Sequence, residues 1–324
     1  MPTHRLRGNL LLLATAAIWG FAFTAQRVGA EHVGAGTFNG IRFALGALVL
    51  LPLVRVLDRR AAGGPANPAT PAASRRHRWR AAVVPGLFAG TLLYLGALLQ
   101  QLGIVSTTAG TAAFITGLYV VLVPVLGIAL GHRTNRLTWL GVVLAVTGLY
   151  FLCVTSDLRI AAGDALILAS AVAFAGHILV IDAVTDRDPL RLSIVQFLTC
   201  AGLSAGTSPW TDPAPFSGVG DAVVPILYGG LLSVGVAYTL QVVAQADTVA
   251  SHAALILATE SVFGVIGGSL LLGETMTGRG YLGCALMLAG IITSQLRPVP
   301  RTSRDGGPAG SRAPPPTTPP ASGW

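Results

Sequence analysis

The stretch LGHRTNRLTWLG at residues 130–141 recurs as LGETMTGRGYLG at residues 272–283. The match continues beyond both stretches, and its identical pairs share one shift of 142 residues: Gly131, Leu140, Gly141, Leu144 and Gly148 fall on Gly273, Leu282, Gly283, Leu286 and Gly290. Two weaker sets precede it in the same order. Val84-Pro85 matches Val224-Pro225 at a shift of 140, and Gly8-Asn9 matches Gly163-Asp164 at a shift of 155. A repeat of this length indicates two copies of one structural unit.

Composition places both copies in a membrane. The 324 residues are 52% hydrophobic and only 10% charged, and their mean hydropathy is +0.68. Soluble domains carry about 25% charged residues, so most of this chain lacks a surface suited to water. Cys153, Cys200 and Cys284 are odd in number and lie in or at the end of apolar runs. They are interpreted as packing residues, and the sequence predicts neither a disulfide framework, a metal site nor a cofactor.

Ten apolar stretches are long enough to cross a hydrocarbon core, which takes roughly 20 helical residues. They are residues 10–28, 37–57, 81–102, 108–130, 136–154, 162–183, 190–208, 222–244, 249–272 and 279–296. The predicted fold class is therefore an all-α integral membrane protein with ten transmembrane helices, five in a first repeat (8–154) and five in a second (162–296). Because five is odd, the second repeat enters the membrane from the opposite side, so the repeats are expected to be inverted.

The arginine distribution predicts the orientation of these spans. All 21 basic residues are Arg, and the net charge is +8. With the N terminus inside, 17 of them fall on the cytoplasmic side and only Arg27, Arg159 and Arg279 fall outside. This is the positive-inside pattern of membrane proteins, so we expect no nucleic-acid partner. The prediction is a multi-pass protein of the cell (inner or plasma) membrane with cytoplasmic N and C termini.

Three segments need separate interpretation. The basic MPTHRLR followed by an apolar run resembles a signal peptide, but the same pattern recurs at Gly163, so we expect no cleavage. Residues 58–80 are rich in Pro, Ala, Gly and Arg, and residues 297–324 are rich in Pro, Ser, Thr and Gly. Both are expected to be flexible cytoplasmic segments, a loop and a tail.

An ordered set of residues resembles the drug/metabolite transporter superfamily, specifically its EamA-type ten-helix transporters. The resemblance covers about residues 8–296 and rests on Trp19-Gly20, Arg42, Pro124, Gly163-Asp164, Glu260 and Gly273-Glu274. It implies export or exchange of small metabolites, often amino acids. Two positions depart from the family pattern. Gly131-His132-Arg133 stands where many relatives have Gly-Glu-Arg, and Ser261 stands where Pro often follows the glutamate, so a proline kink is not assumed there.

Glu260 is the foremost candidate for a transport role because charged groups in a membrane cost about 2.5 to 3.5 kcal/mol on insertion scales. It lies halfway along the predicted helix 249–272. It is either a titratable group at a central cavity that couples proton movement to substrate release, or a structural carboxylate buried against a partner. His252 and Thr259 lie about 20° apart on the same helix and are candidates for a shared polar face. For His252, an interfacial position is the alternative.

Arg42 and four residues in two further helices complete the main candidates. Arg42 could attract a substrate carboxylate, although snorkelling to the interface or a structural ion pair is favoured. Tyr94 and Gln101 share one face of the third predicted helix, and Tyr238 and Gln241 share one face of the eighth. Gln101 and Gln241 are equivalent in the two repeats. These side chains either bind a zwitterion in a wet cavity or form interhelical hydrogen bonds.

Trp19, Tyr119 and His177 lie within helices and either line a site or pack in the core. Core packing is favoured for each, and only Trp19 is retained as a candidate substrate-binding residue. An enzyme is the main alternative class, but the sequence has no HExxH, CxxC or GxSxG motif. A receptor or structural protein is a further alternative, but it would not explain the inverted duplication, which alternating access uses directly.

The sequence therefore predicts a secondary transporter whose partners are a small-molecule substrate and the lipid bilayer, and the resemblance implies that it is an exporter. Proton coupling and a homodimer remain open.

Overall fold

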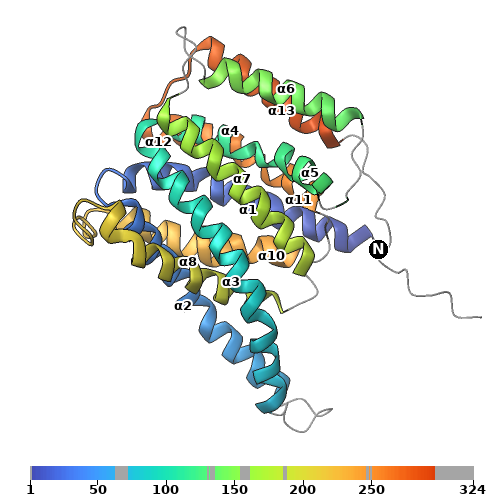
Figure 1. The fold of residues 1–324 in the computed structure, drawn as a ribbon, viewed down its shortest axis with the longest axis vertical. Coiled ribbons are helices and arrows are strands. Elements are labelled where there is room, and N and C mark those ends of the chain that lie inside the picture. The colour runs from blue at the N-terminus through green and yellow to red at the C-terminus, as the bar shows by residue number, and fades with distance from the viewer. Residues whose placement is uncertain are drawn as a thin grey trace, which may run out of the picture.

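The computed structural model describes residues 2–62, 72–129, 131, 136–153, 161–184, 188–245, 248 and 250–295. Within these residues all regular secondary structure is helical, and the helices form one bundle (Figure 1). The expectation of an all-α chain is confirmed for this part of the protein.

The helices follow the predicted stretches closely. The first half of the chain forms α1 (Pro2–Gly29), α2 (Ala35–Ala62), α3 (Ala72–Gly103), the 3₁₀ turn η1 (Ile104–Ser106), α4 (Ala109–Gly117), α5 (Tyr119–Ala129) and α6 (Arg136–Cys153). The second half forms α7 (Ala162–Val184), α8 (Pro189–Thr211), α9 (Val223–Leu227), the π-helix η2 (Tyr228–Tyr238), α10 (Thr239–Gln245), α11 (Ala250–Leu257), α12 (Glu260–Leu272) and α13 (Gly278–Gln295).

Six helical stretches are long and apolar enough to cross a membrane, counting only the described residues. They are Leu6–Gly29, Ala35–Arg59, Arg76–Ser106, Ala109–Ala129, Ala162–Val184 and Val223–Gln245. The chain is thus a multi-pass membrane protein, while the count of ten spans stays a prediction. The expected loop at 58–80 is helical at both ends, because α2 continues to Ala62 and α3 begins at Ala72. Residues 63–71 and the tail from residue 296 lie outside the described part.

Two of the predicted helices are interrupted, at nearly the same place in the two halves. Leu118 separates α4 from α5, and residues 258–259 separate α11 from α12. The second interruption needs no proline: the Ser261 hydroxyl donates to the Ala258 carbonyl at 2.8 Å and also approaches the Ala113 carbonyl at 3.3 Å. Backbone bonds of the i to i−3 type replace the regular helical pattern there. As a result Glu260 is the first residue of a new helix.

The short helices α4 and α11 begin at carboxylates supplied by other segments. Glu274 accepts hydrogen bonds from the backbone N–H groups of Ala109 (2.8 Å) and Gly110 (3.2 Å) at the start of α4. Asp182, near the end of α7, accepts one from Ala250 (3.1 Å) at the start of α11. Carboxylates stabilise helix N termini because the free N–H groups and the helix dipole are positive there.

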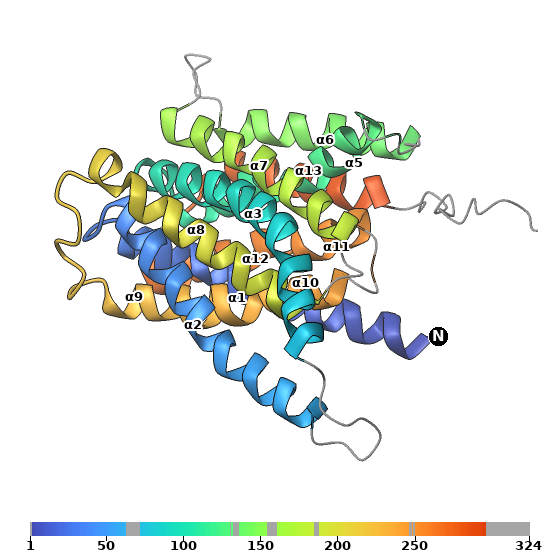
Figure 2. The ribbon, with the colours of Figure 1, turned by 60° about the horizontal axis from the view of Figure 1, so that its bottom comes forward.

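The helices of the two halves are interleaved. α2 lies along α8, α3 along α7 and α8, and α1 along α12 and η2. α6 and α13 pack along each other at one side of the bundle (Figure 2). Consecutive long helices run in opposite directions, so the ends of α2, α5 and α7 and the starts of α1, α3 and α8 lie toward the same end of the bundle (Figures 1 and 2). We call this the Arg-rich end.

Candidate functional site

A cavity lies in the interior between helices from both halves. The space open to the centres of water molecules measures about 40 Å³, enough for a few waters at roughly 10 to 15 Å³ each. Its lining combines aromatic, amide, hydroxyl and charged side chains: Trp19, Ala22, Phe23, Gln26, Arg42, Gln100, Thr116, Tyr119, Phe174, His177, Ile178, Ser233, Tyr238, Gln241 and Glu260. Ligand sites in proteins typically exceed about 300 Å³, so the cavity as it stands is too small for a metabolite.

Tyr238 is the centre of the aromatic wall of the cavity. Its ring packs against four others, with centroid distances of 4.5 Å to Trp19, 6.0 Å to Phe43 and Phe197, and 6.1 Å to His177. Tyr238 ends the π-helix η2, whose winding brings both it and Ser233 to the cavity. The Trp19 indole donates to the Ser233 carbonyl at 3.1 Å, which fixes this wall.

Two oppositely charged side chains, Arg42 and Glu260, face this cavity. Both are buried, with 3% and 2% of their surface exposed. The Arg42 guanidinium carbon lies 5.3 Å from the Phe38 ring centroid and 5.1 Å from that of Phe43. Neither Arg42 nor Glu260 forms an ion pair with another described residue. A buried charge is costly without a partner, so both groups are suited to a charged ligand.

Several polar atoms around the cavity have no hydrogen-bond partner among the described residues. They are Gln26 Oε1, Gln241 Oε1, Glu260 Oε1, the Tyr119 hydroxyl and Arg42 Nε. The Tyr119 hydroxyl is close enough to the Glu260 carboxyl group to interact with it electrostatically, but outside hydrogen-bonding geometry. Nearly all buried polar groups in folded proteins are paired. The oxygens are therefore positioned for water or for a ligand carrying N–H or O–H donors, and Arg42 Nε is positioned to donate to water or to a ligand oxygen.

The structure brings five of the nine candidate residues from the sequence to this cavity: Trp19, Arg42, Tyr238, Gln241 and Glu260. For Arg42, burial at the cavity replaces the expected snorkelling to the interface. The Gln241 amide donates to Gln245 Oε1 at 2.9 Å, which leaves its own oxygen free.

Three candidates lie elsewhere. Gln101 donates to the Gln26 backbone carbonyl at 3.1 Å, the Tyr94 hydroxyl donates to Thr207 Oγ1 at 3.1 Å, and the Thr259 hydroxyl donates to the Ile256 carbonyl at 2.6 Å. None of the three lines the cavity. These hydrogen bonds within and between helices occupy the polar groups that the sequence offered to a substrate. The side chain of His252 is outside the described residues.

Residues that were not candidates also line the cavity. Gln100, the chain neighbour of Gln101, donates to Thr116 Oγ1 at 3.0 Å. Tyr119 and His177, expected in the core, lie at the cavity, and His177 Nε2 is 2.9 Å from Gln196 Oε1. The sequence feature that could have identified them is a polar residue within an apolar span. Gln26, Gln100 and Thr116 are all of this kind. In the described residues no three His, Cys, Asp or Glu side chains are grouped as metal ligands.

Comparison with known proteins gives consistent results. The family model of the EamA-like transporter family matches residues 6–154 and 161–295. An uncharacterized transporter of Archaeoglobus fulgidus is 29% identical over 295 residues, covering 90% of this chain and 87% of that protein. The uncharacterized protein PA1977 of Pseudomonas aeruginosa is 28% identical over 313 residues, covering 94% and 100%. A crystal structure of a protein with 16% identity has a TM-score of 0.62 and covers 89% of this chain and 96% of its own, which shows a shared fold.

Proposed function

Because the chain belongs to the EamA-like transporter family, we propose that it is a secondary transporter that exports small zwitterionic metabolites, such as amino acids, by alternating access between two inverted repeats. Arg42 and Glu260 carry this proposal. They face one cavity with opposite charges and without an ion pair to each other. A zwitterion has a carboxylate for Arg42 and an ammonium group for Glu260.

The neutral groups of the cavity support the same substrate class. The free oxygens of Gln26, Gln241 and Glu260 would accept hydrogen bonds from an ammonium group. An arginine guanidinium binds a carboxylate through two parallel hydrogen bonds. The aromatic wall around Tyr238 would cover the rest of a small metabolite. The substrate would enter only after the cavity widens, since its present volume holds a few waters.

Helix packing supports two inverted repeats. α3 packs against α7 and α8, and its counterpart, the α9–η2–α10 stretch, packs against α1 and α2. α4 packs against α7, and its counterpart α11 packs against α1. Two further pairs join counterparts directly, α2 with α8 and α6 with α13, and the packing of α4 against α12 is matched by that of α5 against α11. Exchanging the two halves therefore reproduces the contacts. In this reading α6, α8, α11 with α12, and α13 are the four further spans.

The interrupted helices support a binding site at the level of Glu260. Broken helices at corresponding positions of two repeats are a feature of transporter substrate sites. Here the breaks at Leu118 and residues 258–259 correspond to within two residues under the shift of 142, and Tyr119 and Glu260 follow them directly. The two residues face the same cavity.

A transport assay tests the proposal. Proteoliposomes loaded with one unlabelled amino acid should take up the same labelled amino acid by exchange, and Arg42→Gln should raise KM about tenfold or more, because a hydrogen bond to a charged group contributes roughly 1.5 to 3 kcal/mol. Glu31→Gln, which alters the exposed Arg27–Glu31 pair, is the matched control and should leave KM unchanged. A folded protein that moves no amino acid under any gradient would contradict the proposal.

Proton coupling is tested at Glu260. We propose that a pH gradient drives export and that this carboxyl group takes up and releases the proton. Glu260→Gln cannot do so, and should retain amino-acid exchange at equal pH while losing the stimulation of net transport by a pH gradient. Net transport by Glu260→Gln that still follows the gradient would remove Glu260 from the coupling mechanism.

A further inference from the structure

α2 and α8 lie side by side in opposite directions (Figure 1). At each end of this pair, an aspartate from the last turns of one helix binds the first turn of the other. The two contacts stand at opposite ends of the bundle, and the cavity lies between them.

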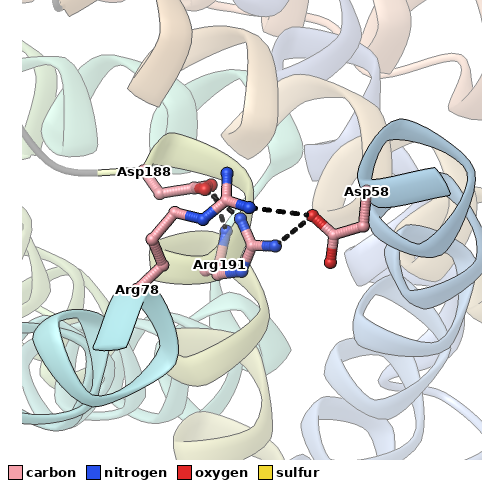
Figure 3. Close-up of polar contacts among 4 residues, drawn as sticks. All are labelled: Asp58, Arg78, Asp188 and Arg191. Carbon is pink, nitrogen blue, oxygen red and sulfur yellow. Dashed lines mark hydrogen bonds and ion pairs between the residues drawn. The ribbon is translucent and has the colours of Figure 1, made fainter. Parts of the chain in front are cut away.

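At the Arg-rich end the aspartate is Asp58 of α2. Its Oδ1 accepts a hydrogen bond from Arg191 of α8 and lies 3.5 Å from Nη2 of Arg78 of α3 (Figure 3). Arg191 is 3% exposed, pairs also with Asp188, and lies over the Trp79 ring at 5.5 Å. Three helices are joined here through one buried guanidinium group.

At the opposite end the aspartate is Asp212, which follows α8. It accepts hydrogen bonds from the backbone N–H groups of Gly36 (2.9 Å) and Thr37 (2.7 Å) and from the Thr37 hydroxyl (2.6 Å). Asp212 is 5% exposed. At Gly34, an added Cβ would lie 2.3 Å from the Asp212 carboxyl carbon, so only glycine permits this approach.

The two contacts are equivalent in the sequence repeat. A single shift of 154 residues carries Asp58 to Asp212, Thr37 to Arg191 and Phe43 to Phe197. Phe43 and Phe197 contact each other between the two ends, with ring centroids 6.2 Å apart. Equivalent residues that touch mark the axis about which the α2–α8 pair is symmetric, and each aspartate contact is the image of the other.

We propose that Asp58–Arg191 and Asp212–Thr37 are two latches that close the Arg-rich end and the opposite end of the transport pathway in turn. This rests on the proposed function, since alternating access needs one closure on each side of the membrane. Both latches are formed in this structure, in agreement with its small cavity. Arg42 lies five residues after Thr37, about 7.5 Å along the helix, so opening the Asp212 latch would release the helix that carries a cavity charge.

The latches differ in chemistry. The Asp58 latch joins side chains of opposite charge, while the Asp212 latch holds the start of a helix through backbone N–H groups and a hydroxyl. Removing either carboxylate charge should weaken only the latch to which it belongs. The conformational equilibrium should then shift in opposite directions in the two variants.

Cysteine accessibility tests this prediction without a substrate. Ala22→Cys, placed at the cavity in a chain whose three native cysteines are alanine, would be labelled with a charged thiol reagent in vesicles of either orientation. Asp58→Asn should raise the labelling rate from the Arg-rich side about fivefold or more and lower it from the other side; Asp212→Asn should do the reverse. Glu31→Gln, at an exposed ion pair within one helix, should change neither rate.

Two milder variants guard against loss of folding. Arg78→Gln removes the 36% exposed partner of Asp58, and Thr37→Val removes only one hydroxyl from the other latch. They should give smaller shifts in the same opposite directions. Labelling rates from the two sides that change in the same direction, or that stay at the parent values in folded protein, would contradict the proposal of two latches. Because labelling needs no transport, opposite shifts in a protein that moves no amino acid would contradict the proposed substrate class and leave the latches standing.

Discussion

Gln100 and Gln101 are chain neighbours in α3 with different surroundings. Gln100 lines the cavity and donates to the Thr116 hydroxyl, whereas Gln101 is 1% exposed and holds the Gln26 carbonyl. Successive residues of an α-helix point about 100° apart, so one of the two faces the cavity and the other faces α1. The sequence assigned this role to Gln101 through its match with Gln241, but the direction of each side chain depends on how α3 is rotated in the bundle.

These neighbours provide a matched test of the cavity. Gln100→Leu should raise KM for amino-acid exchange, because it removes a polar group from the cavity lining. Gln101→Leu should leave KM near the parent value. It should lower the free energy of unfolding in detergent by about 1 kcal/mol, because one hydrogen bond is lost. Exchange kinetics and thermal unfolding of both variants decide the matter; the reverse assignment of the two effects would place Gln101 at the cavity.

At the scale of elements, α6 and α13 pack through glycines. A Cβ added at Gly148 would lie 2.5 Å from the Gly283 carbonyl oxygen, and one added at Gly290 would lie 2.6 Å from the Gly141 carbonyl oxygen. The same shift of 142 that relates the repeats exchanges these two contacts. Small residues let transmembrane helices approach closely. Here the repeated segments, residues 130–148 and 272–290, also contact each other.

This packing predicts opposite effects for two glycine substitutions. Gly148→Ala should lower the thermal unfolding temperature, because its methyl group meets the backbone of α13. Gly202 of α8 has no atom within 4 Å of an added Cβ. Gly202→Ala should therefore keep or raise the unfolding temperature, because alanine favours a helix over glycine by up to about 1 kcal/mol of unfolding free energy. Thermal unfolding in detergent compares them, and equal stability of the two variants would contradict the close α6–α13 contact.

At the scale of the whole molecule, arginine asymmetry predicts how the bundle sits in the membrane. Asp58, Arg78 and Arg191 lie at the Arg-rich end, and the loop that follows Asp212 lies at the other. Positive charge is retained on the cytoplasmic side of membrane proteins. We therefore propose that the Asp58 latch faces the cytoplasm and the Asp212 latch faces the outside.

Two exposed positions test this orientation. In a chain whose native cysteines are alanine, an impermeant thiol reagent applied to intact cells should label Ser217→Cys, in the loop after Asp212. It should label Arg76→Cys, at the start of α3, only after the cells are permeabilised. Both residues are exposed in the bundle. Labelling of Arg76→Cys in intact cells would reverse the orientation, and with it the side on which each latch acts.

Local patterns along the chain are enough to identify a membrane protein and to place its helices. Long apolar runs are local, and the hydrocarbon core requires helices of a minimum length. The ends of α7 and α13, for example, lie within a residue or two of the predicted limits. The buried charges could also be predicted from the sequence, because a glutamate or an arginine within an apolar span is energetically costly and usually functional. Glu260 and Arg42 both line the cavity.

Which faces of the helices meet depends on how the helices pack. Lipid-facing and core-facing positions of a transmembrane helix are both apolar, so the pattern carries little information about rotation. For this reason Gln100 and His177 were not among the candidate site residues, and Tyr94 was placed at a cavity it does not reach. The Asp58 and Asp212 latches were invisible for a related reason: each joins residues more than a hundred positions apart, and only the packing of α2 against α8 brings them together.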